Sequence, residues 1–513
     1  MNGVNWVALT VFVLLFGFIT WLGFVAAHWR RGDLDQLHEW GLGGRRFGTM
    51  VTWFLVGGDV YTAYTFIAVP ALAFGAGAIA FFAVPYTVMI YPILFLAFPR
   101  IWQVAHKHGY ITAGDFVKGR YGNRWLALAV SVTGIVATMP YIALQLVGLQ
   151  VVIAAMGVSG AGLVGDLPLI IAFVVLAAFT YSSGLRAPAA IAIVKDALIY
   201  LTAFTAAIVI PIQLGGFSHI FAAVPAQKLL LAMPGPNTTG AYGVYITLAV
   251  GSAMALFLYP HSLTGILSAS SSHAVRRNAA MLPAYSFMLG VLALFGFFAL
   301  AAGVDKLPEF AAGFARYKAS FAVPALFLHS FPSWFVGIAF AAIGIGALVP
   351  AAIMSIAAAN LYTRNIHREF FNTNPTDKQE SQIAKWVSLI VKLGALVFVL
   401  FVPSQYAIQL QLLGGIWIIQ TFPSVVVGLY TRWFNDWALL LGWAVGTGTG
   451  TAMAAAMNFT PTYPLVLGGM TFSGYTALYT VILNLAVAIV LTPVFNALGA
   501  ARRDETAPAD YHA

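Results

Sequence analysis

Apolar segments of about 20 residues recur along this chain of 513 residues, with short polar loops between them. Each segment is long enough to cross the hydrocarbon core of a bilayer as a helix. The segments are continuous apolar runs, whereas the strands of a membrane barrel alternate polar and apolar residues. Hydrophobic residues make up 61% of the chain and charged residues 8%, a balance unlike that of soluble domains. The sequence therefore predicts an all-α polytopic membrane protein with about 13 transmembrane helices.

The distribution of basic residues predicts the orientation of these helices. Lys and Arg gather in alternate loops such as 29–48 and 99–124, and the opposite loops hold few of them. By the positive-inside rule, we expect the N-terminus outside and the C-terminus in the cytoplasm. The net charge of +9 is spread over many short loops, so it does not indicate nucleic-acid binding. The polar tail after the last helix, residues 499–513, is expected to be disordered.

Several classes of function are excluded by what the sequence lacks. The chain contains no cysteine, which rules out disulfides, thiol catalysis and iron–sulfur clusters. No loop has room for a soluble catalytic or signalling domain, and no Walker-type glycine loop is present. Bis-histidine haem would need paired histidines in mid-membrane, and only His261 is placed there. An enzyme and a cofactor are therefore not expected, and a transporter is favoured over a passive channel or a sensor.

Two predicted helices are interrupted in mid-membrane. The segment 49–76 contains Gly57, Gly58 and Asp59, and the segment 241–268 contains Gly251 and Pro260. Glycine weakens a helix and proline removes a backbone donor, so both segments are expected to break. They stand five predicted helices apart, as the first helices of two inverted repeats would. The alternative is that these glycines only permit close packing and that the prolines only kink their helices.

The interval of five helices between the two breaks predicts how the chain is organised. Residues 49–214 form the first five-helix repeat and residues 215–427 the second. An extra helix and first inner loop, 1–48, precede them, and two extra helices, 428–498, follow. In such transporters, substrate and ion bind near the membrane midplane, where the broken helices meet.

Five stretches of sequence resemble the sodium/solute symporter family over nearly the whole chain. They are GGRRFGTMVTWFLVGGD at 43–59, ITAGDFVKGRYGNR at 111–124, YSSGLRAPAAIAIVKD at 181–196, YPHSLTGILSAS at 259–270 and PAAIMSIAAANLYTRNI at 350–366. The resemblance implies the leucine-transporter-type 5+5 inverted repeat. Within the family, the sequence is most similar to bacterial monocarboxylate permeases, which import lactate, pyruvate and related acids. It thus implies a symporter in the bacterial inner membrane with a small organic acid as its substrate.

The resemblance also implies a sodium site between the first and eighth core helices. Its carbonyl ligands would be those of Gly57 and Val60 on one side and Ala352 on the other, with the hydroxyl of Ser355. The next position, where the family has Ser or Thr, is Ile356. Hard cations bind oxygen ligands, so the loss of one hydroxyl should weaken sodium binding.

A second departure lies on the fifth core helix. Asp196 matches a family aspartate near the sodium site, and the preceding residue, usually neutral, is Lys195. A buried ammonium can replace a bound cation and can carry a proton. We therefore favour proton coupling through Lys195 or Asp196, with sodium as the alternative. Because the two residues are adjacent, Lys195 could instead point away and only snorkel. Asp59 is expected to hold the first break open or to add negative field.

The substrate site is expected where the two breaks meet. A small carboxylate needs hydrogen-bond donors, which tyrosine, threonine, histidine and glutamine supply. The candidate residues are Tyr61, Thr62, Tyr64, Tyr259, His261, Gln145 and Gln420. For the two glutamines the alternative is hydrogen bonding between helices, and for His261 it is a bond to carbonyls freed by Pro260.

Two further features have competing interpretations. The charged loop with Asp115, Lys118, Arg120 and Arg124 is either an inner gate or a solvated loop. Lys392 is explained by snorkelling to the cytoplasmic surface. The function expected from the whole sequence is a symporter of small monocarboxylates. The alternative is a sodium-coupled symporter of another small solute, such as an amino acid or acetate.

Overall fold

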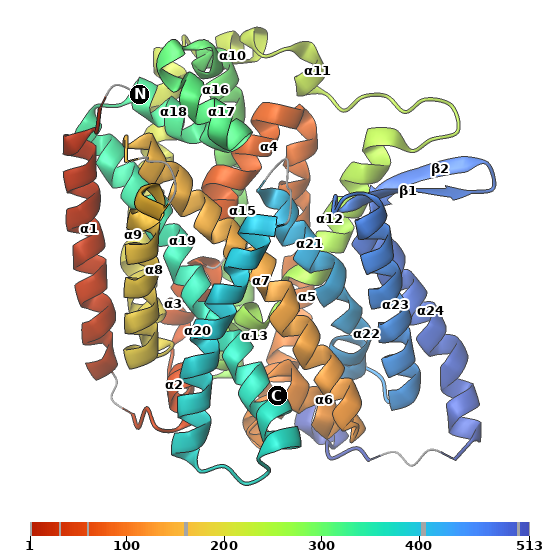
Figure 1. Cartoon of the computed structure of the whole chain (residues 1–513). Coiled ribbons are helices and arrows are strands. Elements are labelled where there is room, and N and C mark those ends of the chain that lie inside the picture. The colour runs from red at the N-terminus through yellow and green to blue at the C-terminus, as the bar shows by residue number, and fades with distance from the viewer. Residues whose placement is uncertain are drawn as a thin grey trace.

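The computed structural model describes residues 3–29, 32–58, 61–158, 163–401, 407–499 and 503–511. Long helices run side by side in a bundle, with α1 at one edge and α23 and α24 at the opposite edge (Figure 1). The chain termini lie at opposite ends of this bundle (Figure 1). The end with the C-terminus also carries Lys107, Arg120, Arg364 and Arg432, and is called the basic end below.

The bundle helices are α1 (Trp6–Val25), α3 (Thr49–Gly58), α4 (Val69–Ala76), α5 (Ala83–His108), α7 (Arg124–Ala155), α8 (Leu163–Ser183), α9 (Arg186–Gln213), α12 (Gly240–Leu256), α13 (Pro260–Leu267), α15 (Pro283–Ala293), α16 (Phe295–Ala302), α19 (Ser333–Tyr362), α20 (Asp377–Phe401), α21 (Ile408–Ile418), α22 (Phe422–Val425), α23 (Asp436–Ala456) and α24 (Thr476–Ala497). Shorter helices are α2 (Leu37–Leu42), α6 (Ala113–Tyr121), α10 (Phe217–Ala223), α11 (Ala226–Leu229), α14 (Ser272–Met281), α17 (Ala311–Tyr317) and α18 (Ala322–Ser330). Single turns and π-helical segments used below are η3 (Tyr64–Ala68), η8 (Thr363–Phe371), η10 (Val427–Leu429) and η11 (Pro508–Tyr511).

The helical membrane architecture is confirmed, but the predicted number of spans is not. Within the described residues, nine helical segments are long and apolar enough to cross a membrane, or ten if the bent pair α12 and α13 counts as one. Thr49–Gly58 in α3, which belongs to a predicted span, is shorter than a full crossing, and one helical segment, Tyr64–His108, covers the rest of that span and the next predicted one. Thr49–Gly58 is short because its helix is broken, which apolar length alone does not register.

The centre of the bundle is α19, which packs against α1, α7, α9 and α20. Its sequence is rich in Gly and Ala, and small residues let helix backbones approach closely in a membrane. Nearly all of this helix is buried within the protein. The elements around it are thereby held in fixed positions, including both interrupted helices.

Both predicted interruptions are present among the described residues. Helix α3 ends at Gly58, and helical structure resumes in η3, before Pro70 at the start of α4. Helices α12 and α13 meet at an angle of 46°, with Pro260 as the first residue of α13. Proline is tolerated there because the first helical N–H has no intrahelical partner. Asp59 and Val60, to which roles were assigned at the first break, lie outside the described residues.

A β-hairpin that the all-α prediction omitted connects α23 to α24. Strand β1 (Thr462–Leu467) pairs antiparallel with β2 (Met470–Tyr475). The two-residue loop between them, Gly468 and Gly469, has φ angles of 57° and 79°, which glycine adopts without strain. The predicted last span began too early, because residues of β2 were assigned to the helix.

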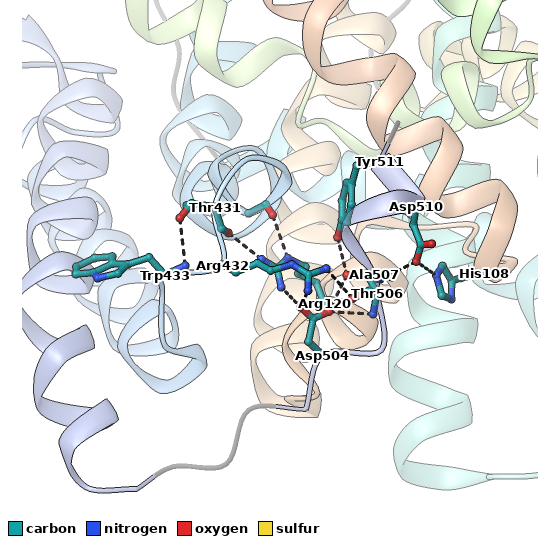
Figure 2. A network of polar contacts seen from close by, with 11 residues as sticks. His108, Arg120, Thr431, Arg432, Trp433, Asp504, Thr506, Ala507, Asp510 and Tyr511 are labelled. Carbon is teal, nitrogen blue, oxygen red and sulfur yellow. Dashed lines mark hydrogen bonds and ion pairs between the residues drawn. The ribbon is translucent and has the colours of Figure 1, made fainter. Parts of the chain in front are cut away.

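The expectation of a disordered C-terminal tail is corrected for residues 503–511, called the strap below. Asp504 pairs with Arg120 and Arg432, and Asp510 pairs with His108 (Figure 2). Lys107 pairs with Asp510 as well. Asp510 and Tyr511 are buried. The strap is thus held against the basic end by carboxylates that pair with basic residues far away in sequence. The polar composition of the tail did not indicate these pairs.

Candidate functional site

The first helix break is built around the side chain of Lys195. This residue lies on α9 and is completely buried. Its ammonium donates hydrogen bonds to the carbonyl oxygen of Gly58, where α3 ends, and to that of Tyr61, at 3.1 Å. Its Nζ is also 3.1 Å from Asp196 Oδ1. The ammonium therefore occupies the space where carbonyls freed by the break converge, and it does not snorkel to the surface.

Asp196 connects the same break to α15. Tyr285 donates its hydroxyl hydrogen to Asp196 Oδ2 at 2.8 Å. Tyr61 in turn donates to the backbone carbonyl of Tyr285 at 3.0 Å. Gly58, Tyr61, Lys195, Asp196 and Tyr285 thus form a buried network, called the break cluster below. Although Lys195 and Asp196 are adjacent on one helix, both side chains are buried in it.

The close packing of the break cluster depends on two glycines. A Cβ at Gly57 would lie 2.2 Å from a ring carbon of Tyr285, and a Cβ at Gly58 would lie 2.7 Å from Lys195 Nζ. Gly57 and Gly58 are therefore required by side-chain packing as well as by the bend of the backbone. The carbonyls that contact Lys195 are those of Gly58 and Tyr61, each one position after the predicted Gly57 and Val60.

The positions predicted on α19 offer the carbonyl of Ala352 and the hydroxyl of Ser355, while the side chain of Ile356 has no oxygen. Ala352, Ser355 and Ile356 are all buried. Ser355 donates its hydroxyl hydrogen to the carbonyl of Ala352 at 2.8 Å, within the same helix. Ile356 contributes only hydrocarbon. No group of three or more metal-ligating His, Asp or Glu side chains exists among the residues that the structure describes.

Gln145 on α7 reaches the second half of the first broken helix. Its Oε1 accepts a hydrogen bond from the backbone N–H of Ala63 at 3.1 Å. Its Nε2 is buried and has no hydrogen-bond partner in the described part of the chain. Close approach of α7 is allowed by Gly148, where a Cβ would lie 2.3 Å from that of Ala63. Gln145 therefore brings to the break an amide donor that has no acceptor among the described residues.

Thr62 and Tyr64 complete the start of this second half. The hydroxyl oxygen of Thr62 accepts the backbone N–H of Tyr64 at 2.9 Å, as a helix cap does. The Tyr64 ring is buried against that of Tyr86 at 6.4 Å, edge to face. Both residues are at the break, as predicted, and Thr62 uses its oxygen to organise the backbone.

The second break is surrounded by aromatic rings. The Tyr141 ring, on α7, lies 5.3 Å from Tyr259 and 5.4 Å from His261, the residues that flank Pro260. The Tyr259 hydroxyl donates to the carbonyl of Gln411 on α21 at 2.8 Å. Both predicted residues therefore line this break, and α7 contributes a side chain to each of the two breaks.

Gln420 lies elsewhere. Its amide nitrogen donates to Thr480 Oγ1 at 2.8 Å, and its Oε1 accepts from Asn484 at 3.1 Å, both residues on α24. It thus joins two helices by side-chain hydrogen bonds, which was the alternative reading of this residue. Lys392 also differs from expectation: it is completely buried and its Nζ has no hydrogen-bond partner among the described residues.

The charged loop at the basic end is part of an ionic network. Asp115 accepts from Asn365, at 2.8 Å, and lies 3.5 Å from Arg364, both residues of η8 after α19. Lys118 pairs with Glu369 at 2.5 Å. Arg124 stacks on Trp125 and Phe370 instead of pairing.

One ion pair of the basic end was missed altogether. Glu39 and Arg186 are buried and paired with each other, and Arg46 pairs with the same carboxylate at 2.8 Å. Glu39 precedes the first broken helix and Arg186 starts α9, so the pair ties the base of one to the other. Nothing in the spacing of the sequence indicated it.

Comparison with known proteins gives a consistent result. The model of the sodium:solute symporter family matches residues 40–446. A monocarboxylate transport permease protein of Rhizobium johnstonii is 51% identical over 502 residues, which cover 96% of this chain and 98% of that protein. An uncharacterized symporter of Bacillus subtilis is 30% identical, over 96% of this chain and 94% of its own length.

A solved structure has the same fold. It is the substrate-bound, outward-open state of a Na⁺-coupled sialic acid symporter, with a TM-score of 0.74 over 95% of this chain and 98% of that chain. Its sequence identity is 16%, so the likeness establishes the fold alone.

Proposed function

Since the chain belongs to the sodium:solute symporter family, it is a membrane symporter of small solutes and not an enzyme, and we propose that it imports small monocarboxylates such as lactate or pyruvate with protons. The proposed location is the bacterial inner membrane, with the basic end in the cytoplasm. The substrate class rests on the 51% identical relative, which is named a monocarboxylate permease. The coupling ion rests on one observation, the position of the Lys195 ammonium.

Lys195 occupies the first break in the way that a bound cation would. Its ammonium has three donors, and two carbonyls and a carboxylate lie within reach of them. Hydrogen bonds from a charged donor are about twice as strong as neutral ones, so they offset part of the cost of burying the charge. A sodium ion would have to displace this ammonium or share its carbonyls.

The coupling follows from the two states of this amine. Protonated Lys195 holds Gly58 and Tyr61 together and balances the charge of Asp196. When the proton leaves, the amine keeps only two donors and the carboxylate loses its counter-charge. The break then relaxes, which we infer to be the step that links proton release to reorientation of the broken helix.

The substrate carboxylate is proposed to bind beside the first break. Gln145 Nε2 is a buried amide donor without a protein acceptor in the described structure, and the hydroxyls of Tyr61, Thr62 and Tyr64 are close in sequence to the backbone that it contacts. Tyr259 and His261 are proposed to face the substrate from the second break. A carboxylate that accepts from Gln145 would satisfy a donor whose burial otherwise costs free energy.

A sodium-coupled symporter of another small solute, such as an amino acid or acetate, is the second candidate. The observation in its favour is the shared fold with a Na⁺-coupled symporter. The lysine in the break and the missing hydroxyl at Ile356 favour protons.

The test is uptake of labelled lactate and pyruvate into proteoliposomes, with a proton gradient and a sodium gradient imposed separately. We expect accumulation with the proton gradient and none with sodium alone. Accumulation that requires sodium would refute proton coupling. A failure to accumulate either acid under both gradients would refute the substrate class.

A further inference from the structure

A strip of exposed apolar side chains on α5 leads to an arginine. Val88, Met89, Phe95 and Leu96 are all exposed on the outside of the bundle. Val88 and Phe95, like Met89 and Leu96, stand seven residues apart, about two helical turns, so they lie along one side of the helix, and Arg100 follows Leu96 by four residues. In a membrane protein, such a strip faces the acyl chains of lipids. The strip therefore runs along the hydrocarbon region and ends at a guanidinium near the basic end.

Arg100 lines a cavity with two other arginines. The cavity has a volume of about 370 Å³, and its walls come from α5, α6, the segment after α22 and the strap. The lining side chains that bear on the argument are Arg100, Arg120, Tyr430, Arg432 and Tyr511. Figure 2 shows Arg120 and Arg432 converging on the strap from separate parts of the chain.

The charges of these arginines are incompletely balanced. Asp504 pairs with Arg120, and it lies 3.5 Å from Arg432. Arg100 has no carboxylate within ion-pair distance in the described chain, and its guanidinium lies over the Tyr430 ring, 4.5 Å from the centroid. Among the residues that line the cavity or pair with its arginines in the ion pairs given above, Asp504 is the one carboxylate and there are three guanidinium groups, which makes the described lining positive.

Exposed aromatic residues place this cavity at the membrane surface. Tyr430 and Trp433 lie between η10 and α23, Trp437 lies in the first turn of α23, and all three are exposed. Tyr and Trp concentrate where hydrocarbon meets water. The positive cavity therefore lies at headgroup depth, directly beyond the apolar strip of α5.

We propose that this cavity binds the phosphate group of an anionic phospholipid, with the acyl chains of the lipid along the strip Val88–Leu96. Basic pockets between transmembrane helices on the cytoplasmic side are suited to anionic headgroups. Arg100 is the principal contact because no carboxylate of the described residues pairs with its charge. Arg120 and Arg432 add charge, and the strap forms one wall through Tyr511.

The test is native mass spectrometry of the purified full-length protein, titrated with phosphatidylglycerol or with phosphatidylcholine. Wild type is expected to retain phosphatidylglycerol in preference to phosphatidylcholine, and Arg100→Gln to lose about fivefold in apparent affinity for phosphatidylglycerol. Arg124→Gln is the matched control, because Arg124 is an exposed arginine that stacks on aromatic rings away from the cavity. It should bind the lipid as wild type does.

Further arms make each result decisive. Arg432→Gln, at an exposed side chain, should also weaken phosphatidylglycerol binding. Thermal unfolding of this variant detects any folding defect. Inorganic phosphate that displaces the lipid at millimolar concentration would assign the cavity to free phosphate and overturn the lipid. Equal affinity for the two lipids, or equal loss in Arg124→Gln and Arg100→Gln, would also overturn it.

Discussion

Lys195 combines two properties that rarely occur together in a membrane helix, a positive charge and complete burial. Its ammonium contacts the carbonyls of Gly58 and Tyr61, so replacing it leaves those acceptors without a donor. We predict that Lys195→Gln removes proton-driven accumulation of the substrate while exchange of internal for external substrate persists. The check is uptake under a proton gradient compared with counterflow in the same liposomes.

Lys385→Gln is the control for this prediction. Lys385 is also a buried lysine, but it lies in the first half of α20, and its ammonium is 5.7 Å from the centre of the Tyr181 ring. Its replacement should leave accumulation intact. Equal loss in the two variants would indicate that removing any buried charge impairs the protein.

A second prediction at the residue scale concerns the two glutamines that the sequence analysis grouped together. Gln145→Leu removes the acceptor of the Ala63 N–H and the free amide donor, so KM should rise about 3- to 10-fold. Gln420→Leu breaks the contact with Thr480 and Asn484, so it should lower thermal stability and leave KM unchanged. Transport kinetics and unfolding of the two variants, measured side by side, distinguish these roles. A raised KM in Gln420→Leu alone would reverse the assignment.

Part of the site could be predicted from single residues of the sequence. Lys195 and Asp196 could be singled out because charges inside an apolar segment are rare. The directions of their side chains could not be predicted, because adjacent residues of a helix point to different faces. Only the converging carbonyls of the folded chain show that both side chains reach the break. The pair of Glu39 and Arg186 was missed because its members are 147 positions apart in loops where charges are common.

Among the helices, the first broken one depends on Gly57, which allows close packing as well as a bend in the backbone. We predict that Gly57→Ala destabilises the protein by about 1 to 3 kcal/mol, since its Cβ would overlap the Tyr285 ring and disturb the bond to Asp196. Gly17→Ala on α1 is the control, because no atom lies within 4 Å of the added carbon. Thermal unfolding in detergent measures both, and equal stability of the two variants would contradict the account.

The predictable elements are those with local signals. Gly57, Gly58 and Pro260 each act on their own backbone, so both breaks could be placed from sequence. The hairpin also had a local signal, two glycines between β-rich runs, but it was masked by an apolar segment long enough to read as a span. The count of membrane spans was not confirmed, because the single helical segment Tyr64–His108 runs through parts of two predicted spans, 49–76 and 78–98.

At the scale of the whole molecule, the strap joins α5 to the segment after α22 through Asp510 and Asp504. The ammonium of Lys107, the backbone N–H of Ala507 and the ring of His108 hold the pKa of Asp510 well below its usual range. A lowered pKa means that docking is favoured above the ordinary carboxyl range and is lost only as the pH falls through the lowered value. From about pH 5 to pH 8, Asp510 should therefore remain ionised and the strap docked.

The corresponding variant is Asp510→Asn, which removes the charge that Lys107 and His108 bind. We predict severalfold faster tryptic cleavage after Arg503 than in wild type, at a rate independent of pH in that range once protease activity is normalised. Asp305→Asn, at an exposed position, serves as the control. Wild-type cleavage as fast as that of Asp510→Asn would show that the strap is not held by this contact.

The overall architecture was predictable for a different reason. The apolar segments predicted a membrane protein, and the five-helix interval between the two breaks predicted the inverted repeat. The resemblance indicated the family. The strap was not predictable, because its order comes from Arg120, Arg432 and His108, which only the folded chain brings to the strap (Figure 2).

The central claim is that Lys195 carries the coupling proton, and entrapped pH dye in sodium-free proteoliposomes tests it most directly. External lactate or pyruvate, added under a potential that is negative inside, should acidify the lumen of wild-type liposomes and leave Lys195→Gln liposomes at their starting pH. The same variant should still exchange labelled substrate. Acidification of equal size in the two, or substrate entry into wild-type liposomes only after sodium is added, would contradict the account.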